Sequence, residues 1–222
     1  MKKALIFDSS SIITLSMNNL LNLLPPLKKK FKGEFYITEG VKREIVDKPL
    51  QIKRFELNAM MISNMINEGV LSLYVGDIKE KSEMFLDKAN NAYIADGEKL
   101  KIVHYGEASC IALYDELKKR GYKLALVIDE RTTRMLCENP INLGKLLGSK
   151  LHTNVKLFNE EANFFRDIEI IRSAELCFAA YKLGIIKLPG KPIEDIDALL
   201  YAAKFKGCSI SQEEIEQAKR LV

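Results

Sequence analysis

The chain has 222 residues, 47% of them hydrophobic, which fits one large domain or one domain with a small appendage. Its 34 basic and 30 acidic residues give a net charge of +4, which permits nucleic-acid binding without indicating it. No run of about 18 apolar residues occurs, and the N-terminal apolar stretch stops at Asp8. We therefore expect no membrane span, no signal peptide and a cytoplasmic protein.

The four cysteines contain no C-x-x-C pair, and each lies in an apolar or helical stretch: Cys110, Cys137, Cys177 and Cys208. This pattern predicts buried thiols in a reducing compartment rather than a metal site or a disulfide framework.

Compact apolar or β-branched runs with turn or charge signals beside them predict five strands, at residues 3–7, 34–37, 70–75, 123–128 and 155–158. Helical spacing predicts helices between them, at residues 12–31, 51–69, 80–99 and 106–121, the first interrupted by Pro25-Pro26. Strands that alternate with helices indicate an α/β fold with a mostly parallel five-stranded sheet.

The strand signals fade after about residue 160. Residues 160–184 read as one long helix, residues 193–207 as a second, and residues 211–222 as a third. Ser211 and Glu214 have the spacing of a capping box for the last helix. We therefore predict a domain at residues 1–160 and a helical C-terminal extension at residues 161–222.

Four acidic residues lie where a ligand site is expected. Asp8 and Asp129 follow predicted strands, Glu107 opens the helix 106–121, and Glu44 comes just after the second strand. Ligands of open parallel sheets bind at the carboxyl ends of the strands, so these acids converge if the helices begin near that edge.

Clustered carboxylates repel one another, and a hard cation such as Mg²⁺ or Mn²⁺ relieves the repulsion. Such an ion activates water and neutralises charge on a phosphodiester, which indicates phosphoryl chemistry. Three of the acids also have an ordinary alternative: Glu107 as a partner of the helix dipole, Glu44 as surface charge, and the Asp129-Glu130 pair as a helix cap.

The four acidic segments, in this order, resemble the motifs of the PIN-domain nucleases, in an archaeal branch of that family. The segments are "ALIFDSSSII", "FYITEGVKREIVD", "YGEASCIALYDELKKRG" and "LALVIDERTTRMLCE". The chain departs from the commoner pattern by a Glu at position 107, by "DERTTR" in the fourth motif, and by its helical tail. These departures favour an archaeal branch that is not a toxin.

The resemblance implies a three-layer α/β/α PIN-like fold and a metal-dependent endoribonuclease with a four-carboxylate Mg²⁺ or Mn²⁺ site. It carries Asp8, Glu107 and Asp129 over as direct or water-bridged metal ligands, and Glu44 as the acid that completes the pocket. Ser10 occupies the position of a hydroxyl that orients Asp8, although a plain turn or N-cap serine is an equal alternative.

Substrate contacts follow from the basic residues beside the acids. Arg43, Arg131 and Arg134 are candidates for phosphate binding, because arginine pairs bidentately with phosphate oxygens. Their alternative is a solvated helix surface or pairing with the acids. The family also implies single-stranded or structured RNA as a partner, an antitoxin-like protein if the chain is a toxin, and a homodimer.

Two other functions are compatible with parts of the sequence. A PIN-like scaffold that binds RNA or protein without catalysis fits the helical tail and the modest charge. A phosphatase with Asp8 as nucleophile is disfavoured, because Ser10 stands where that chemistry requires a second acid.

Overall fold

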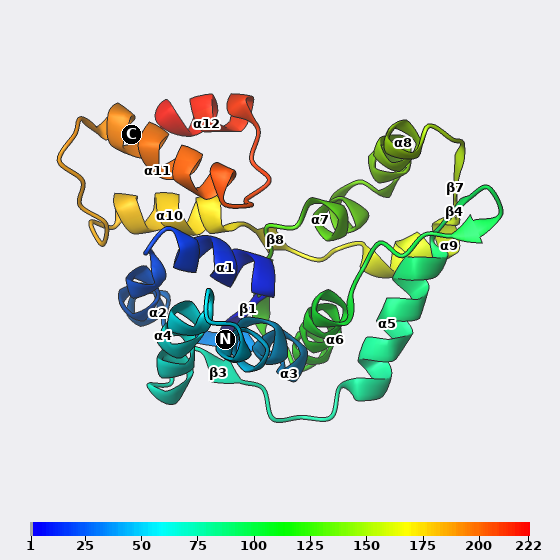
Figure 1. Ribbon diagram of the computed structural model, residues 1–222, viewed down its shortest axis with the longest axis horizontal. Helices are drawn as coiled ribbons and strands as arrows, with labels where there is room; N and C mark the ends of the chain where they lie inside the picture. The colour runs from blue at the N-terminus through cyan, green and yellow to red at the C-terminus, as the bar shows by residue number, and fades with distance from the viewer. Residues whose placement is uncertain (1) are drawn as a thin grey trace.

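The main sheet of the computed structural model, which describes residues 2–222, consists of five strands in parallel pairs. Their bounds are β1 Lys3–Phe7, β2 Glu34–Ile37, β3 Ser72–Leu73, β6 Lys123–Val127 and β8 Ile170–Ile171. Their order across the sheet is β3-β2-β1-β6-β8 (Figure 1). The α/β class and the five-stranded parallel sheet predicted from the sequence are confirmed.

A smaller antiparallel sheet lies apart from the first. It contains β4 Tyr93–Ala95, β5 Glu98–Lys99 and β7 Val155–Leu157, in the order β5-β4-β7.

Helices make up most of the remaining chain. The α-helices are α1 Ser9–Met17, α2 Leu24–Phe31, α3 Glu39–Lys42, α4 Glu56–Asn67, α5 Lys79–Asn91, α6 Tyr105–Lys119, α7 Arg131–Glu138, α8 Pro140–Leu151, α9 Asn159–Ala162, α10 Ser173–Lys182, α11 Pro192–Phe205 and α12 Gln212–Lys219. Short 3₁₀ segments are η1 Leu21–Leu23, η3 Pro49–Gln51 and η4 Asn163–Phe165, and η2 Arg43–Asp47 is a π-helical turn. No helix within residues 2–222 is long and apolar enough to cross a membrane.

Strand β1 lies at the centre of the sheet, where its apolar residues are buried on both faces. Ala4 to Phe7 are buried, as expected for a strand in a parallel sheet covered by helices. Leu5 pairs in register with Phe35 of β2 and with Ala125 of β6. The Phe7 and Phe35 rings lie 5.1 Å apart, which joins β1 and β2 through the core as well as through the backbone.

The fifth strand of the sheet is not the one predicted. Residues 155–157 do form a strand, β7, but it pairs with β4 in the antiparallel sheet. The fifth parallel strand is β8, which pairs Ile170 and Ile171 with β6. A strand of two residues shows no alternation in the sequence, so its isoleucines matched the helical pattern around them.

The predicted helix at residues 160–184 is therefore wrong. The structure divides this stretch into α9, η4, β8 and α10. Since β8 lies after residue 160, the parallel sheet continues into the segment predicted as a helical extension.

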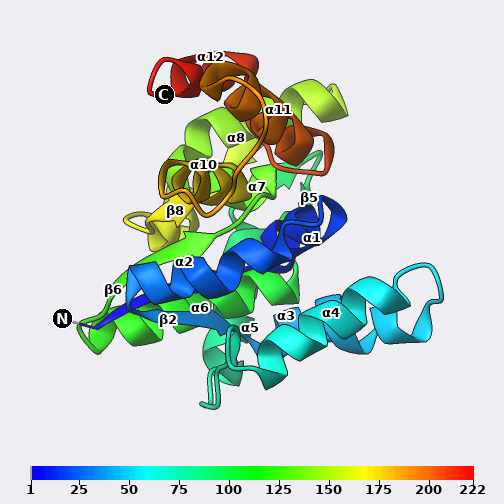
Figure 2. The same ribbon diagram turned by 90° about the vertical axis from the view of Figure 1, so that its left-hand side faces the viewer.

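The C-terminal helices stack above α1 in Figure 1, and Figure 2 shows them gathered at one end of the molecule. They share a second apolar core, which includes Ile196, Leu200 and Ile215. The predicted capping box of the last helix is confirmed: the Glu214 amide donates to Ser211 Oγ at 3.1 Å, and the Ser211 amide donates to Glu214 Oε2 at 2.7 Å. All four cysteines are buried free thiols, as predicted.

The Phe35 ring is expected to be a main contributor to stability. It is buried between Phe7 and Phe31, so Phe35→Ala leaves a cavity in the core and lowers the free energy of unfolding by about 3–5 kcal/mol in urea titrations. Val75→Ala, at a side chain that is 94% exposed, is the control and changes it by less than about 0.5 kcal/mol. Similar losses in the two variants would contradict the assigned core.

Candidate functional site

Asp8 ends β1 and begins α1. It is the N-cap of α1, and its Oδ2 accepts hydrogen bonds from the Ser10 amide at 3.0 Å and from Ser10 Oγ at 2.6 Å. Its other oxygen, Oδ1, is buried and has no hydrogen-bond partner within residues 2–222. A buried carboxylate oxygen normally has a partner, so Oδ1 is available for a ligand that the protein itself does not supply.

Glu107 lies in the first turn of α6 with its side chain largely buried. The carboxylate accepts a hydrogen bond from the backbone amide of His104, just before the helix. This contact makes Glu107 part of the cap of α6, at the helix end where the dipole favours a negative charge, in line with the helix-dipole alternative given above. It engages Oε2, and the structure assigns no hydrogen bond to the second oxygen, Oε1, within residues 2–222.

Glu44 lies in the π-helical turn η2, and its carboxylate rests against the start of α6. A Cβ atom at Gly106 would lie 2.8 Å from each Glu44 carboxylate oxygen, closer than real Cβ contacts. Glycine at position 106 therefore allows Glu44 to reach the N-terminal end of α6, where the helix dipole favours a negative charge. Sequence reasoning missed Gly106, although the Gly-Glu pair in "YGEAS" was its signal.

Three of the predicted acids thus interact electrostatically. Burial raises the pKa of the Glu107 carboxyl to about 8, and the charges of Asp8, Glu130 and Glu44 add to the rise against the His104 hydrogen bond. Burial likewise raises the pKa of Asp8 to about 6; the Ser10 hydrogen bonds oppose this rise and Glu44 adds to it. A bound cation would favour the ionised form of each group.

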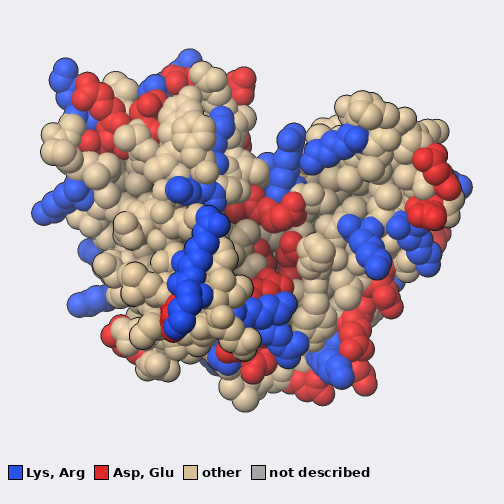
Figure 3. Space-filling view, viewed as in Figure 1, with Lys and Arg blue, Asp and Glu red and all other residues tan. Residues whose placement is uncertain are grey.

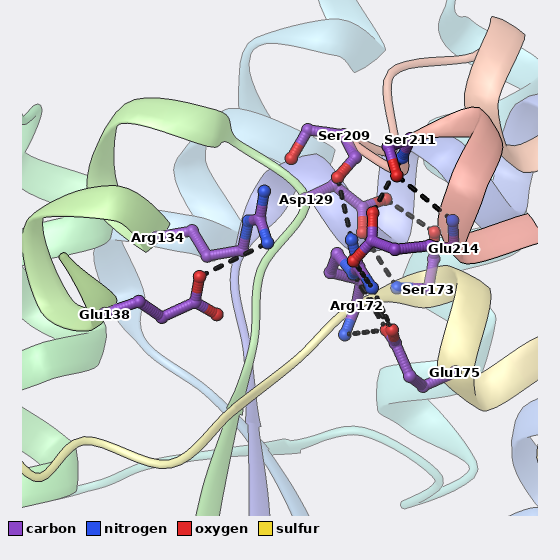
Figure 4. A network of polar contacts seen from close by, with 9 residues as sticks. All are labelled: Asp129, Arg134, Glu138, Arg172, Ser173, Glu175, Ser209, Ser211 and Glu214. Carbon is purple, nitrogen blue, oxygen red and sulfur yellow. Dashed lines mark hydrogen bonds and ion pairs between the residues drawn. The ribbon is translucent and has the colours of Figure 1, made fainter. Parts of the chain in front are cut away.

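Asp129, the fourth predicted acid, faces another part of the molecule. Its Oδ1 accepts from the Ser173 amide at 2.8 Å and its Oδ2 accepts from Ser173 Oγ at 2.6 Å, at the start of α10 (Figure 4). Both oxygens are therefore engaged with the protein. Asp129 anchors α10 to the end of β6. No local pattern indicates its partner Ser173, because the two residues are 44 positions apart in the chain.

Ser10 connects the two aspartates. Its hydroxyl donates to Asp8 Oδ2 and accepts from the Asp129 amide at 3.0 Å. Ser10 therefore holds Asp8 as expected from the sequence, and its contact with Asp129 ties the carboxyl ends of β1 and β6 together. The assignment of Ser10 to substrate binding, made from the sequence together with the three arginines, stays a prediction.

Glu130 confirms the helix-cap alternative for the Asp129-Glu130 pair, because it is the N-cap of α7. Its charge adds to the raised pKa of Glu107. Its carboxylate caps α7 by accepting from the amides of Thr132 at 2.8 Å and Thr133 at 2.6 Å. Asp129 and Glu130 thus have different roles. Asp129 holds α10, and Glu130 caps α7.

The three predicted substrate arginines differ in their surroundings. Arg43 and Arg131 are exposed, on η2 and at the start of α7. The Arg134 side chain is only 17% exposed and pairs with Glu138, with Nη1 at 3.3 Å from Oε2. Its Nε is buried without a hydrogen-bond partner in the described chain, and Figure 4 shows the pair on α7, to one side of the Asp129 network.

One face of the molecule has a hollow with acidic side chains in it. Figure 3 shows acidic side chains at the floor of a depression between the part with α1 and α10 and the part with α7 and α8, with basic side chains along its rim. A positive rim around a negative floor suits a phosphate backbone that meets a cation-binding centre.

Mg²⁺ requires oxygen ligands in a nearly octahedral arrangement. No three Asp, Glu, His or Cys side chains within residues 2–222 are arranged as ligands of one metal ion. Mg²⁺, however, is usually held by one or two carboxylates and keeps several waters. The free oxygen of Asp8 and the carboxylate of Glu107 fit such a site, whereas Asp129 is fully buried and each of its oxygens already accepts a hydrogen bond from Ser173.

Comparisons of the chain with protein-family models, with curated proteins and with solved structures found no significant match. The resemblance to PIN-domain nucleases therefore rests on the sequence motifs alone.

The structure gives Asp129 a role in stability. We expect Asp129→Ala to lower the free energy of unfolding by about 2–3 kcal/mol in urea titrations, because the buried Ser173 amide and hydroxyl lose their acceptors. Asp87→Ala, at an exposed position of α5, is the control and is expected to change it by less than about 0.5 kcal/mol. An Asp129→Ala variant as stable as the control would show that the Ser173 contact is not important for the fold.

The raised pKa values of Asp8 and Glu107 predict a pH-dependent stability of the metal-free protein. The folded state binds protons that the unfolded state releases, so the free energy of unfolding falls as pH rises from the ordinary carboxyl range toward about 8. Glu107→Gln removes one of these groups and is expected to flatten the profile and to stabilise the protein at the alkaline end.

The measurement is a set of urea titrations in a chelating buffer across this range. Glu83→Gln, at an exposed position of α5, is the control and is expected to keep the wild-type slope. A wild-type profile that rises over the same range would contradict the buried acid cluster.

Proposed function

We propose that the protein is a metal-dependent endoribonuclease with a PIN-like fold of three α/β/α layers. The observation that carries this proposal is Oδ1 of Asp8, which is buried and has no hydrogen-bond partner in the described chain, in a carboxyl whose pKa is raised by burial and by the charge of Glu44. Uncompensated buried carboxylates are costly in a fold, and they cluster at functional sites. The order of the four motifs supplies the link to RNA hydrolysis.

Asp8 and Glu107 are the residues that would hold Mg²⁺ or Mn²⁺. Such an ion, when bound, supplies a water of lowered pKa and a positive charge beside the scissile phosphate. Glu107 has to lose its proton on metal binding, because its pKa of about 8 leaves much of it protonated at neutral pH. Cleavage should therefore increase as the pH rises through neutrality.

Ser10 and Asp129 position other groups of the site, whereas Glu44 acts beside the reacting atoms. Ser10 holds Oδ2 of Asp8, so that Oδ1 keeps its direction. Glu44 completes the acid cluster and accepts a proton or orients a water beside the phosphate. Asp129 maintains the edge of the sheet through Ser10 and Ser173, rather than binding the ion directly.

Arg43 and Arg131 are exposed cations that lie close in the chain to Glu44 and Asp129, and we assign them to the RNA phosphates. Arg134 is a weaker candidate because Glu138 already engages it. A homodimer and an antitoxin-like partner remain proposals of the family resemblance.

The decisive variant is Asp8→Asn, which keeps an acceptor for Ser10 but removes the charge. We expect it to lower cleavage of labelled single-stranded RNA in Mn²⁺ by at least about 100-fold, because the ion loses a charged ligand. Asp77→Asn is the matched control, since Asp77 is exposed and likewise accepts from the amide two residues on, that of Lys79 at 3.1 Å.

Equal cleavage by the wild type and Asp8→Asn would refute the site. RNA binding by the wild type without cleavage in either Mg²⁺ or Mn²⁺ would instead favour the alternative of a non-catalytic PIN-like module.

A further inference from the structure

The outer surface of α11 carries a stacked pair of aromatic rings. Tyr201 and Phe205 are one helical turn apart, with ring centroids at 5.8 Å and an angle of 28° between the rings. Phe205 is 77% exposed, so its outer face is open to solvent. A single exposed apolar residue is ordinary, but a ring that is held by a second ring presents a rigid flat surface.

Two lysines accompany these rings. Lys204 Nζ lies 5.6 Å from the centroid of the Tyr201 ring, and Lys206 follows at an exposed position. Lysine is depleted in protein–protein interfaces, whereas cations beside exposed rings are typical of surfaces that bind single-stranded nucleic acid. The charge of this surface therefore favours RNA over a protein partner.

The end of α11 lies beside α1 and beside the backbone of Asp129 at the end of β6. Thr14 Oγ1 of α1 donates to the Lys206 carbonyl at 3.3 Å, and the Ser209 amide donates to the Asp129 carbonyl at 3.4 Å. Thr14 is one turn, about 6 Å along the helix axis, from Ser10, which holds Asp8. Figure 1 shows the end of α11 next to α1.

We infer that Tyr201, Phe205, Lys204 and Lys206 form a platform on which an unpaired base of single-stranded RNA stacks, next to the acids. This inference rests on the proposed nuclease function and specifies its substrate. The open face of Phe205 receives the base, and the two ammonium groups contact the adjoining phosphates. Paired bases are stacked inside a helix and cannot reach the ring, so the platform selects single strands.

The test measures binding, not cleavage, by fluorescence anisotropy of a short end-labelled oligouridine. All proteins are full-length and carry Asp8→Asn in Mg²⁺, so that the RNA stays intact. We expect Phe205→Ala to weaken binding at least about fivefold, because a base loses its stacking partner. Phe205→Leu, which keeps an apolar side chain, is expected to weaken it similarly, and Phe205→Trp is expected to preserve it.

Phe164→Ala is the matched control. Phe164 is also an exposed ring with a lysine over it, Lys88 at 3.5 Å, but it lies on η4 beside α5, on the opposite side of the molecule from α11 (Figure 1). We expect it to bind the RNA as the parent does, and we expect a duplex of the same length to bind without dependence on Phe205.

Three results would overturn the platform: equal affinities of Phe205→Ala and Phe164→Ala, full binding by Phe205→Leu, or loss of self-association in Phe205→Ala with unchanged RNA affinity. The last would assign the rings to contact between copies of the chain. Failure of the nuclease proposal is distinct, because a wild type that does not cleave in Mn²⁺ can still show binding that depends on Phe205.

Discussion

The arrangement of the site depends on one hydroxyl group. Ser10 donates to Asp8 and accepts from the Asp129 amide, so it joins the carboxyl ends of β1 and β6. Because its hydroxyl engages only one oxygen of Asp8, the other oxygen remains without a partner in the described chain. The same hydroxyl holds the backbone amide of Asp129, and the Asp129 carboxylate binds Ser173 at the start of α10. Ser10 thus contacts both Asp8, whose carboxylate has an oxygen free to bind a ligand, and Asp129, whose carboxylate maintains the fold.

The C-terminal segment is joined to this edge and is not a separate appendage. Strand β8 completes the sheet, Ser173 binds Asp129, and the α11–α12 connection contacts the Asp129 backbone. Arg172 adds a further link, because its guanidinium donates to the Ser209 carbonyl at 2.9 Å and pairs with Glu214 of α12. The α11 platform is therefore held at a fixed place relative to Asp8, as a substrate-binding surface requires.

The sequence predicted those features that local patterns specify. The bounds of β1 and β2, the buried thiols and the capping box at Ser211 agree with the structure, because each depends on neighbouring residues. The two-residue strand β8 and the Asp129–Ser173 contact depend on residues far apart in the chain. Neither has a periodic signal, so the sequence predicts a helix in place of β8 and does not predict the Asp129–Ser173 contact.

Gly106 shows the same difference between features that local patterns specify and features that depend on residues far apart in the chain. Its neighbour Glu107 was recognised as an acid at a helix start, but the approach of Glu44 to Gly106 depends on how α3 and η2 pack against α6. The sequence predicts that Glu44 joins the site. The packing explains how Glu44 reaches it, because a side chain at position 106 would exclude the Glu44 carboxylate.

The most direct measurement of the central claim is a crystal of the wild type grown with Mn²⁺ and examined by anomalous diffraction. We expect an anomalous peak bound by Asp8 Oδ1 and the Glu107 carboxylate, with the Asp129 carboxylate still bonded to Ser173. A peak coordinated by Asp129, with the Ser173 contacts broken, would contradict the division of roles between the two aspartates. Absence of any peak near Asp8 at a saturating Mn²⁺ concentration would contradict the metal site itself.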